Sequence, residues 1–212
     1  MGVKAILFDY GQVLTAASAH ERFWQAQAEL AAALDMRPEA LWPYLFESEA
    51  ARRWFTGQIG PAEFWRLTLE PHGILDPAER AAFAERVFED TNEINPDMAE
   101  LLLRLRGRYK LAVVSNASWS EAELAERIYA GGALPGGLFD AIVTSTSAGA
   151  VKPEPEIFQL ALDRLGVRPQ EAVFCDDLAT FANAAQRLGM QAHHFTTPAA
   201  CVEFLRREGV QV

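Results

Sequence analysis

Cysteine is scarce in this sequence, and long apolar stretches are missing from it. Only two cysteines occur among 212 residues, Cys175 and Cys201, which excludes a disulfide scaffold and any C-x-x-C metal motif. No apolar stretch approaches the length of a membrane span. Residues 1–8 are too short for a signal peptide and run directly into the first predicted strand. We therefore expect a cytoplasmic protein without a membrane partner, either a monomer or a homodimer.

Basic residues are also few. The chain has 19 Lys and Arg against 29 Asp and Glu, which gives a net charge of −10. The densest basic stretch, residues 104–110, alternates basic with other residues and is typical of the polar side of a helix end. A nucleic-acid partner is therefore not expected, because such proteins carry a basic patch. An acidic protein can still bind phosphate through a local cation or a metal ion.

Short apolar runs alternate with helical segments over most of the chain. The runs predict buried parallel strands at residues 3–8, 111–114, 141–143, 172–175 and 191–195. Helices are predicted over residues 98–106, 155–165 and 178–188. A capping box at Ser120 and Glu123 predicts the start of another helix. This alternation predicts an α/β fold, a Rossmann-like doubly wound parallel sheet.

Residues 16–92 break the alternation. They show helical periodicity without a convincing strand, and Pro and Gly at positions 38, 57–61 and 71–73 divide them into several helices. We therefore expect two domains: a core of residues 1–15 and 93–212, and an all-helical insert of residues 16–92 placed after the first strand.

Polar residues stand at the ends of the predicted strands. Asp9 follows the first strand, Ser115 the second, and Asp176 and Asp177 the fourth, while Lys152 lies just past the third. Each has an ordinary interpretation, such as a turn cap, a strand-to-loop junction or a solvated lysine. Together they indicate a site, because ligands of open parallel sheets bind at the carboxyl ends of the strands.

The chemistry of this set favours a metal ion and a phosphoryl group. Three converging carboxylates repel one another unless a cation lies between them. Mg²⁺ prefers such oxygen ligands and also accepts a substrate phosphate. Lys152 and Ser115 would hold the same phosphoryl group, and Asp9 is placed to attack it and form an aspartyl-phosphate.

Four segments carry a resemblance to a known family. Residues 6–15, 113–116, 152–153 and 174–177 resemble, in order, the four motifs of haloacid dehalogenase-like hydrolases. The insert resembles the helical cap domain of subclass I. Residues 54–59 and 63–65 resemble the branch that contains glucose-1-phosphate phosphatase and the N-terminal phosphatase domain of soluble epoxide hydrolases.

The resemblance implies roles for individual residues. Asp9 resembles the nucleophile, Ser115 and Lys152 the phosphate-binding pair, and Asn116 is expected to line the substrate side. The magnesium ligands implied by the family are Asp9, the Gly11 carbonyl, Asp177 and the neighbouring Asp176. A small phosphorylated molecule is the implied substrate.

Two positions depart from the family pattern. Most phosphatases of the family carry a second Asp, a general acid and base, where this chain has Gly11. The leaving group must then take its proton from water or from the cap, beginning with His20 and Glu21, or must leave easily. Many relatives also have Asn where this chain has Phe181, which we interpret as core packing.

Three functions remain open on the sequence alone. A magnesium-dependent phosphatase is the leading hypothesis. The alternatives are a metal-free 2-haloacid dehalogenase and a metabolite-binding protein that lost turnover together with its general acid. The substrate depends on residues of the cap, where the aromatic residues Phe23, Trp24, Trp42, Trp54, Phe55 and Trp65 are more typical of an internal core than of a binding site.

Overall fold

The computed structural model describes residues 2–16, 26–87 and 93–212. The chain divides into two compact units. The core unit comprises Met1–Ala16 and Asn92–Val212, and the cap unit comprises Ala17–Thr91. Over the described ranges, every helix is too short or too polar to cross a membrane.

The core unit is built on one sheet of five parallel strands, as predicted. The strands are β1 (Ala5–Phe8), β2 (Lys110–Ser115), β3 (Ala141–Thr144), β4 (Ala172–Asp176) and β5 (Gln191–His194). Their order in the sheet is β3-β2-β1-β4-β5. The central strand β1 therefore pairs with β2 on one side and β4 on the other, with Phe8 opposite both Val113 and Cys175.

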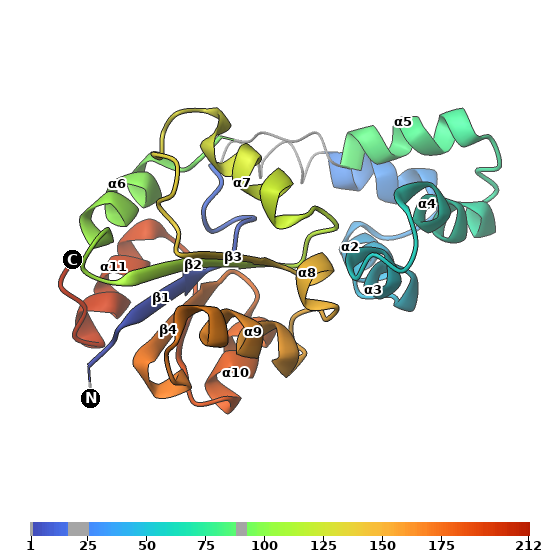
Figure 1. The fold of residues 1–212 in the computed structure, drawn as a ribbon. Helices are drawn as coiled ribbons and strands as arrows, with labels where there is room; N and C mark the ends of the chain where they lie inside the picture. The colour runs from blue at the N-terminus through green and yellow to red at the C-terminus, as the bar shows by residue number, and fades with distance from the viewer. Residues whose placement is uncertain (1, 17–25, 88–92) are drawn as a thin grey trace. The chain divides into compact units, whose positions relative to one another are not determined.

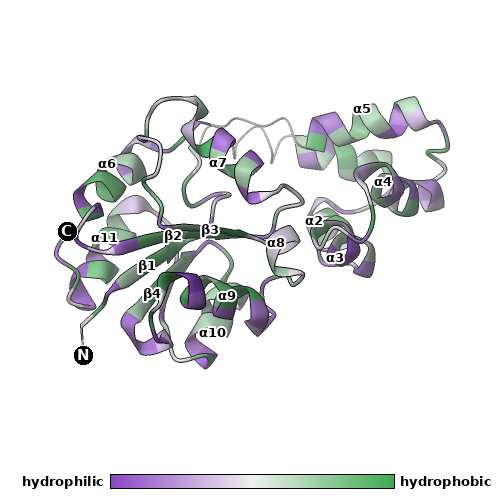
Figure 2. Cartoon of the chain, viewed as in Figure 1, coloured by the Kyte–Doolittle hydropathy of each residue, from purple (hydrophilic) through white to green (hydrophobic). Residues whose placement is uncertain are grey.

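Helices cover both faces of this sheet (Figure 1). One apolar cluster joins Ile6 and Phe8 of β1 to α6 (Pro96–Leu105), α7 (Glu121–Ala130) and α11 (Pro198–Arg207). The other joins Ala5 and Leu7 to α9 (Pro155–Leu165) and α10 (Ala179–Arg187). Successive side chains of a strand point to opposite faces, so β1 is buried on both sides and entirely apolar. In Figure 2 the central strand β1 and its neighbour β2 are largely green (hydrophobic), whereas α9 and α10 carry both green and purple (hydrophilic) segments.

The helix ends follow local capping chemistry. The predicted capping box of Ser120 and Glu123 is present at the start of α7, and Gly166 ends α9 in the left-handed conformation. Helix α6 begins two residues earlier than expected, because Asn95 accepts hydrogen bonds from the backbone of Asp97 and Met98. Helix α11 and the short helix α8 (Ser145–Ala148) were not predicted.

The chain leaves and re-enters the core unit along two paired segments. Thr15 and Ile94 form an isolated antiparallel bridge. Two backbone hydrogen bonds flank it, from Asn95 N–H to the Leu14 carbonyl and from Ala16 N–H to the Glu93 carbonyl, each 2.8 Å long.

The cap unit is helical in all its described secondary structure. Residues 26–33 are helical, followed by α2 (Pro38–Phe46), α3 (Glu49–Phe55), α4 (Pro61–Leu69), the 3-10 turn η1 (Glu70–His72) and α5 (Pro77–Val87). Its centre is aromatic: Trp54 stacks on Phe64 at 4.3 Å between ring centroids and on Phe55 at 5.2 Å. Trp54, Phe55 and Trp65 are buried, which confirms the interpretation of these aromatics as core.

Candidate active site

The central strand places Asp9 beside the end of β4. Strands β2 and β3 lie on one side of the central strand β1 within the sheet, and β4 and β5 lie on its other side. Ligands of such sheets bind where the strand order reverses, here between β1 and β4. The Asp9 N–H donates to the Cys175 carbonyl at 2.9 Å, and Asp176 is the last residue of β4. Both carboxylates therefore lie at one edge of the sheet.

Three carboxylates meet at this edge. One oxygen each of Asp9, Asp176 and Asp177 lies within 4.8 Å of the other two. Asp176 is fully buried, Asp9 is nearly so, and Asp177 is partly exposed. Burial raises the pKa of Asp177 well above its usual value, and repulsion from Asp9 and Asp176 adds to the shift. Burial likewise raises the pKa of Asp176, while Lys152 opposes the shift.

Lys152 brings a buried positive charge into the cluster. Its Nζ lies 2.8 Å from Asp9 Oδ1 and 2.7 Å from Asp176 Oδ2, and the residue is only 2% exposed. Burial lowers the pKa of Lys152, but Asp176 and Asp9 outweigh this effect and raise it above its ordinary value. The two acids thus favour the charged form of the lysine, which joins two of the three carboxylates.

The ammonium group also lies over two aromatic rings. Lys152 Nζ is 5.1 Å from the ring centroid of Phe181 and 5.6 Å from that of Phe174. Both distances are within the range of a cation–π interaction. Phe181 is partly buried and packs against the α9–α10 side of the sheet, which agrees with its interpretation as core packing.

The two oxygens of Asp176 are both engaged by the protein. Oδ1 accepts the Leu178 N–H at 2.8 Å, and Oδ2 accepts Lys152 Nζ at 2.7 Å. Asp177 is held through its backbone, since its carbonyl lies 2.9 Å from His194 Nε2. Asp177 is thus the more available ligand of this pair.

Comparison with known proteins identifies the family of this chain. The family model of haloacid dehalogenase-like hydrolases matches residues 3–189. The chain belongs to the haloacid dehalogenase-like hydrolase family. It is 30% identical to the glyceraldehyde 3-phosphate phosphatase of Methanopyrus kandleri over 203 residues, 89% of this chain and 82% of that protein. It is 29% identical to the (S)-2-haloacid dehalogenase 4A of Burkholderia cepacia over 198 residues, 88% of this chain and 80% of that protein.

A solved structure and two longer relatives complete the comparison. A haloacid dehalogenase-family enzyme from Bacteroides thetaiotaomicron, in complex with magnesium and inorganic phosphate, shares the fold at a TM-score of 0.63 and 23% identity, covering 92% of this chain and 95% of that one. The chain spans only 6% of the mouse acyl-CoA dehydrogenase family member 10 and 9% of the rat bifunctional epoxide hydrolase 2, which it matches over short segments. The family prediction is confirmed, and the branch within the family stays a prediction.

The loop after Asp9 has an unexpected backbone in this family member. Its left-handed residue is Gln12, with φ 59°, whose N–H donates to Thr15 Oγ1 at 3.0 Å. Gly11 is not left-handed, and a Cβ placed on it would meet no atom within 4 Å. The fold therefore does not require glycine at position 11.

Two residues predicted to contact the substrate, Ser115 and Asn116, lie at the end of β2 and directly after it. Ser115 is buried at the end of β2, in register with Thr144 of β3. The Asn116 amide contacts the backbone of Lys152 through both of its polar atoms, and its expected place on the substrate side stays a prediction. The sequence offered no sign of this contact, because the partners are 36 residues apart.

Other contacts near the site also escaped the sequence analysis. Ser145 Oγ is hydrogen-bonded to both the N–H and the carbonyl of Ala117, each at 3.0 Å. The two partners are 28 residues apart in the sequence, so this contact had no local signal. The cap residues His20, Glu21, Phe23 and Trp24 lie outside the described residues.

Proposed function

We propose that this hydrolase is a magnesium-dependent phosphatase of small phosphorylated metabolites that works through an aspartyl-phosphate on Asp9. The observation that carries the proposal is the buried ammonium of Lys152, within 2.8 Å of Asp9 and 2.7 Å of Asp176. A lysine ammonium has three donors. Two are directed at these acids, which leaves the third for a phosphoryl oxygen of the substrate.

The proposed reaction has two displacements at phosphorus. A carboxylate oxygen of Asp9 forms a bond to phosphorus while the ester P–O bond breaks, and the leaving oxygen takes the electron pair and then a proton from water. Water then attacks the same phosphorus, which breaks the bond to Asp9 and releases inorganic phosphate. Lys152 and Ser115 orient the phosphoryl group and offset its negative charge in both steps.

The donor set fits Mg²⁺. Three carboxylates have oxygens within 4.8 Å of one another, and all are hard oxygen ligands. Lys152 pairs with Asp9 and Asp176 only, so the single ammonium leaves negative charge in the cluster that a divalent cation would offset. Asp9, the Gly11 carbonyl and Asp177 would hold the ion, with Asp176 beside them. When bound, it would neutralise charge on the carboxylates and on the phosphoryl oxygens.

The relatives support this proposal and also supply its main rival. The Methanopyrus kandleri relative is named as a phosphatase, and the Bacteroides thetaiotaomicron enzyme was solved with magnesium and phosphate. The Burkholderia cepacia relative is named as a 2-haloacid dehalogenase. In that reaction the aspartate would attack the carbon that bears the halogen. A third carboxylate close to Asp9 and Asp176 favours the phosphatase, because it provides a cation site that halide displacement does not need.

Three assays on the purified protein separate the hypotheses. We expect p-nitrophenyl phosphate to be hydrolysed with Mg²⁺ and not with EDTA, and no chloride to be released from 2-chloropropionate. Metal-independent chloride release would establish the dehalogenase instead. Calorimetric binding of inorganic phosphate without turnover of any ester would establish the metabolite-binding protein. A cytoplasmic location and a monomeric or homodimeric state stay predictions.

A further inference from the structure

We propose that Asn116 is a positioning residue, which holds the main chain of Lys152 so that its ammonium reaches Asp9 and Asp176. The Asn116 Oδ1 accepts the Lys152 N–H at 2.7 Å, and Nδ2 donates to the Lys152 carbonyl at 3.0 Å. The geometry of this contact stands by itself. Its kinetic consequence rests on the proposed phosphatase function.

The pairing has only one chemically sensible orientation. A flipped amide would set its NH₂ group against the Lys152 N–H and its oxygen against the Lys152 carbonyl. With the observed orientation, one side chain satisfies both main-chain polar groups of a buried residue. A buried backbone group left without a partner costs free energy, so the loss of Asn116 would destabilise this arrangement.

Lys152 needs such support because no regular element holds its backbone. It lies between α8 and α9, in a segment that is neither helix nor strand, and Pro153 after it has no N–H. A lysine side chain has four rotatable methylenes and much conformational entropy. Restraining its Cα therefore helps to restrain an ammonium that must meet two carboxylates at once.

A second cross-link provides the matched control. Ser145 joins the same loop after β2 to the segment after β3, but through Ala117 and without contact to the Lys152 backbone. If Asn116 only anchors this loop, Asn116→Ala and Ser145→Ala should have similar effects. If Asn116 positions Lys152, only Asn116→Ala should be coupled to substitution of the lysine.

The kinetic test is a pair of double-mutant cycles with p-nitrophenyl phosphate and saturating Mg²⁺. We expect Asn116→Ala to lower kcat by about 10- to 100-fold, as is usual for residues that orient a reacting group, with a smaller rise in KM because Lys152 also contacts the bound phosphoryl group. Adding Asn116→Ala to Lys152→Ala should lower kcat little further, whereas the fold-losses in kcat of Ser145→Ala and Lys152→Ala should multiply in the double variant. Multiplicative losses for Asn116 and Lys152, or a rise in KM alone, would overturn the proposal and favour the substrate contact expected from the sequence.

A readout that needs no turnover tests the contact itself. Hydrogen exchange of the Lys152 amide, followed by NMR, should be slow in the native protein and in Ser145→Ala and fast in Asn116→Ala. Asn116→Asp keeps the acceptor but loses the donor, so it should retain amide protection with part of the loss in kcat. This variant also serves if Asn116→Ala does not fold. Native protein without phosphatase activity but with this exchange pattern would refute the proposed function and leave the contact established; equal protection in all variants would refute the contact.

Discussion

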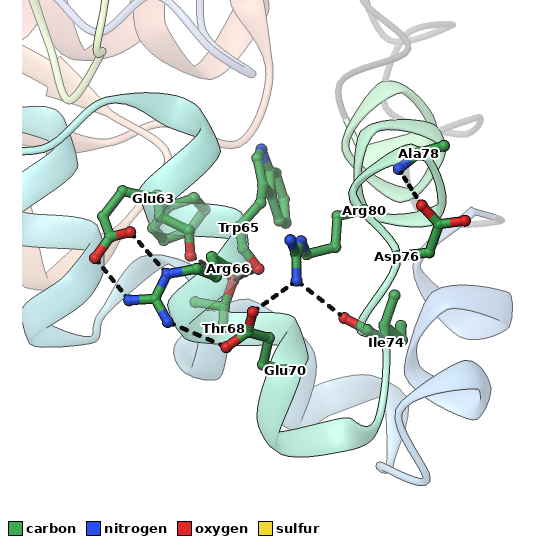
Figure 3. Close-up of polar contacts among 10 residues, drawn as sticks. Glu63, Trp65, Arg66, Thr68, Glu70, Ile74, Asp76, Ala78 and Arg80 are labelled. Atoms are coloured by element: carbon green, nitrogen blue, oxygen red, sulfur yellow. Dashed lines mark hydrogen bonds and ion pairs between the residues drawn. The ribbon is translucent and has the colours of Figure 1, made fainter.

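The core unit buries several charged side chains, whereas every charged side chain in the described part of the cap unit is at least partly exposed. Asp9, Lys152, Glu171 and Asp176 are all buried in the core unit. The buried polar residues described in the cap are Gln27 and Thr68, and neither is charged. The cap's charges form a partly exposed network in which Arg66 contacts Glu63 and Glu70, and Glu70 also contacts Arg80 (Figure 3).

This difference agrees with the proposed location of the active site in the core unit. A buried charge is costly unless it is paired, and even a paired one often stabilises less than an apolar residue would. A cluster of one cation and three acids is therefore poorly explained by stability alone. The described part of the cap holds stacked aromatic rings, which favour its packing, and partly exposed ion pairs, which add little stability. Both are ordinary structural features.

Deletion of the Asp9 charge should have the largest effect. Asp9→Asn keeps the shape of the side chain but removes the nucleophile, so we expect kcat to fall by roughly three orders of magnitude or more while circular dichroism stays native. Glu63→Gln deletes a cap charge in the same way and should change kcat little. Near-normal turnover by Asp9→Asn would break both the mechanism and the contrast between the units.

Metal removal should have the next largest effect. EDTA is expected to abolish phosphatase activity, and added Mg²⁺ to restore it. Asp177→Ala should weaken Mg²⁺ binding more than Asp176→Ala, because both oxygens of Asp176 are already engaged by Leu178 and Lys152. Titration calorimetry with Mg²⁺ measures this order directly. Full activity in EDTA would point to the dehalogenase.

Much of the core unit was predictable because its signals are local. Each strand is a short apolar run that ends at a polar residue, and the register of parallel strands brings those ends to one edge, as Phe8 opposite Cys175 shows. The helix ends at Ser120 and Gly166 were equally local. Helix α11 was missed although Cys201, Phe204 and Leu205 have helical spacing after the cap residue Thr197.

Contacts between distant segments were not predictable. The pairing of Asn116 with Lys152, and that of Ala117 with Ser145, depends on how two loops meet and not on either loop alone. The backbone conformation of Gly11 was also not predictable, because a glycine can adopt a positive φ but does not have to. The structure uses the left-handed region at Gln12 instead.

The missing acid at Gly11 should appear as selectivity for good leaving groups. General acid catalysis contributes about 10²- to 10⁴-fold, mostly for poor leaving groups. We expect aryl phosphates, acyl phosphates and sugar 1-phosphates to react faster than alkyl phosphates. Gly11→Asp should flatten this dependence, because position 11 has an ordinary φ and open space for a side chain.

A plot of log kcat/KM against leaving-group pKa, for the native protein and Gly11→Asp, measures the effect. A flat plot for the native protein, with chemistry shown to be rate-limiting, would mean that another residue donates the proton. His20 and Glu21 of the cap would be the first to replace, which would assign part of the chemistry to the cap unit.

The smallest expected effect compares one glutamate in each unit. Glu171 of the core contacts Lys4 at 2.8 Å and Arg168 at 3.1 Å, with its side chain 7% exposed. Glu70 of the cap contacts Arg66 at 3.1 Å and Arg80 at 2.9 Å, with its side chain 35% exposed. The two residues thus have similar partners and different exposure, which makes them a matched pair.

Hydrogen bonds from Arg168 and Lys4 lower the pKa of Glu171 from 4.5 to about 2. A lowered pKa in the folded protein means that its stabilising effect is complete above the unfolded value and is lost as the pH falls toward the folded one. Glu171→Gln should therefore lower Tm at neutral pH, and the difference should shrink between about pH 4.5 and pH 2. Glu70→Gln should cost about 0.2–1 kcal/mol per ion pair, less in high salt, since exposed pairs are screened. Thermal unfolding of both variants across pH and salt tests this, and a Glu171→Gln difference that is constant down to about pH 3 would contradict it.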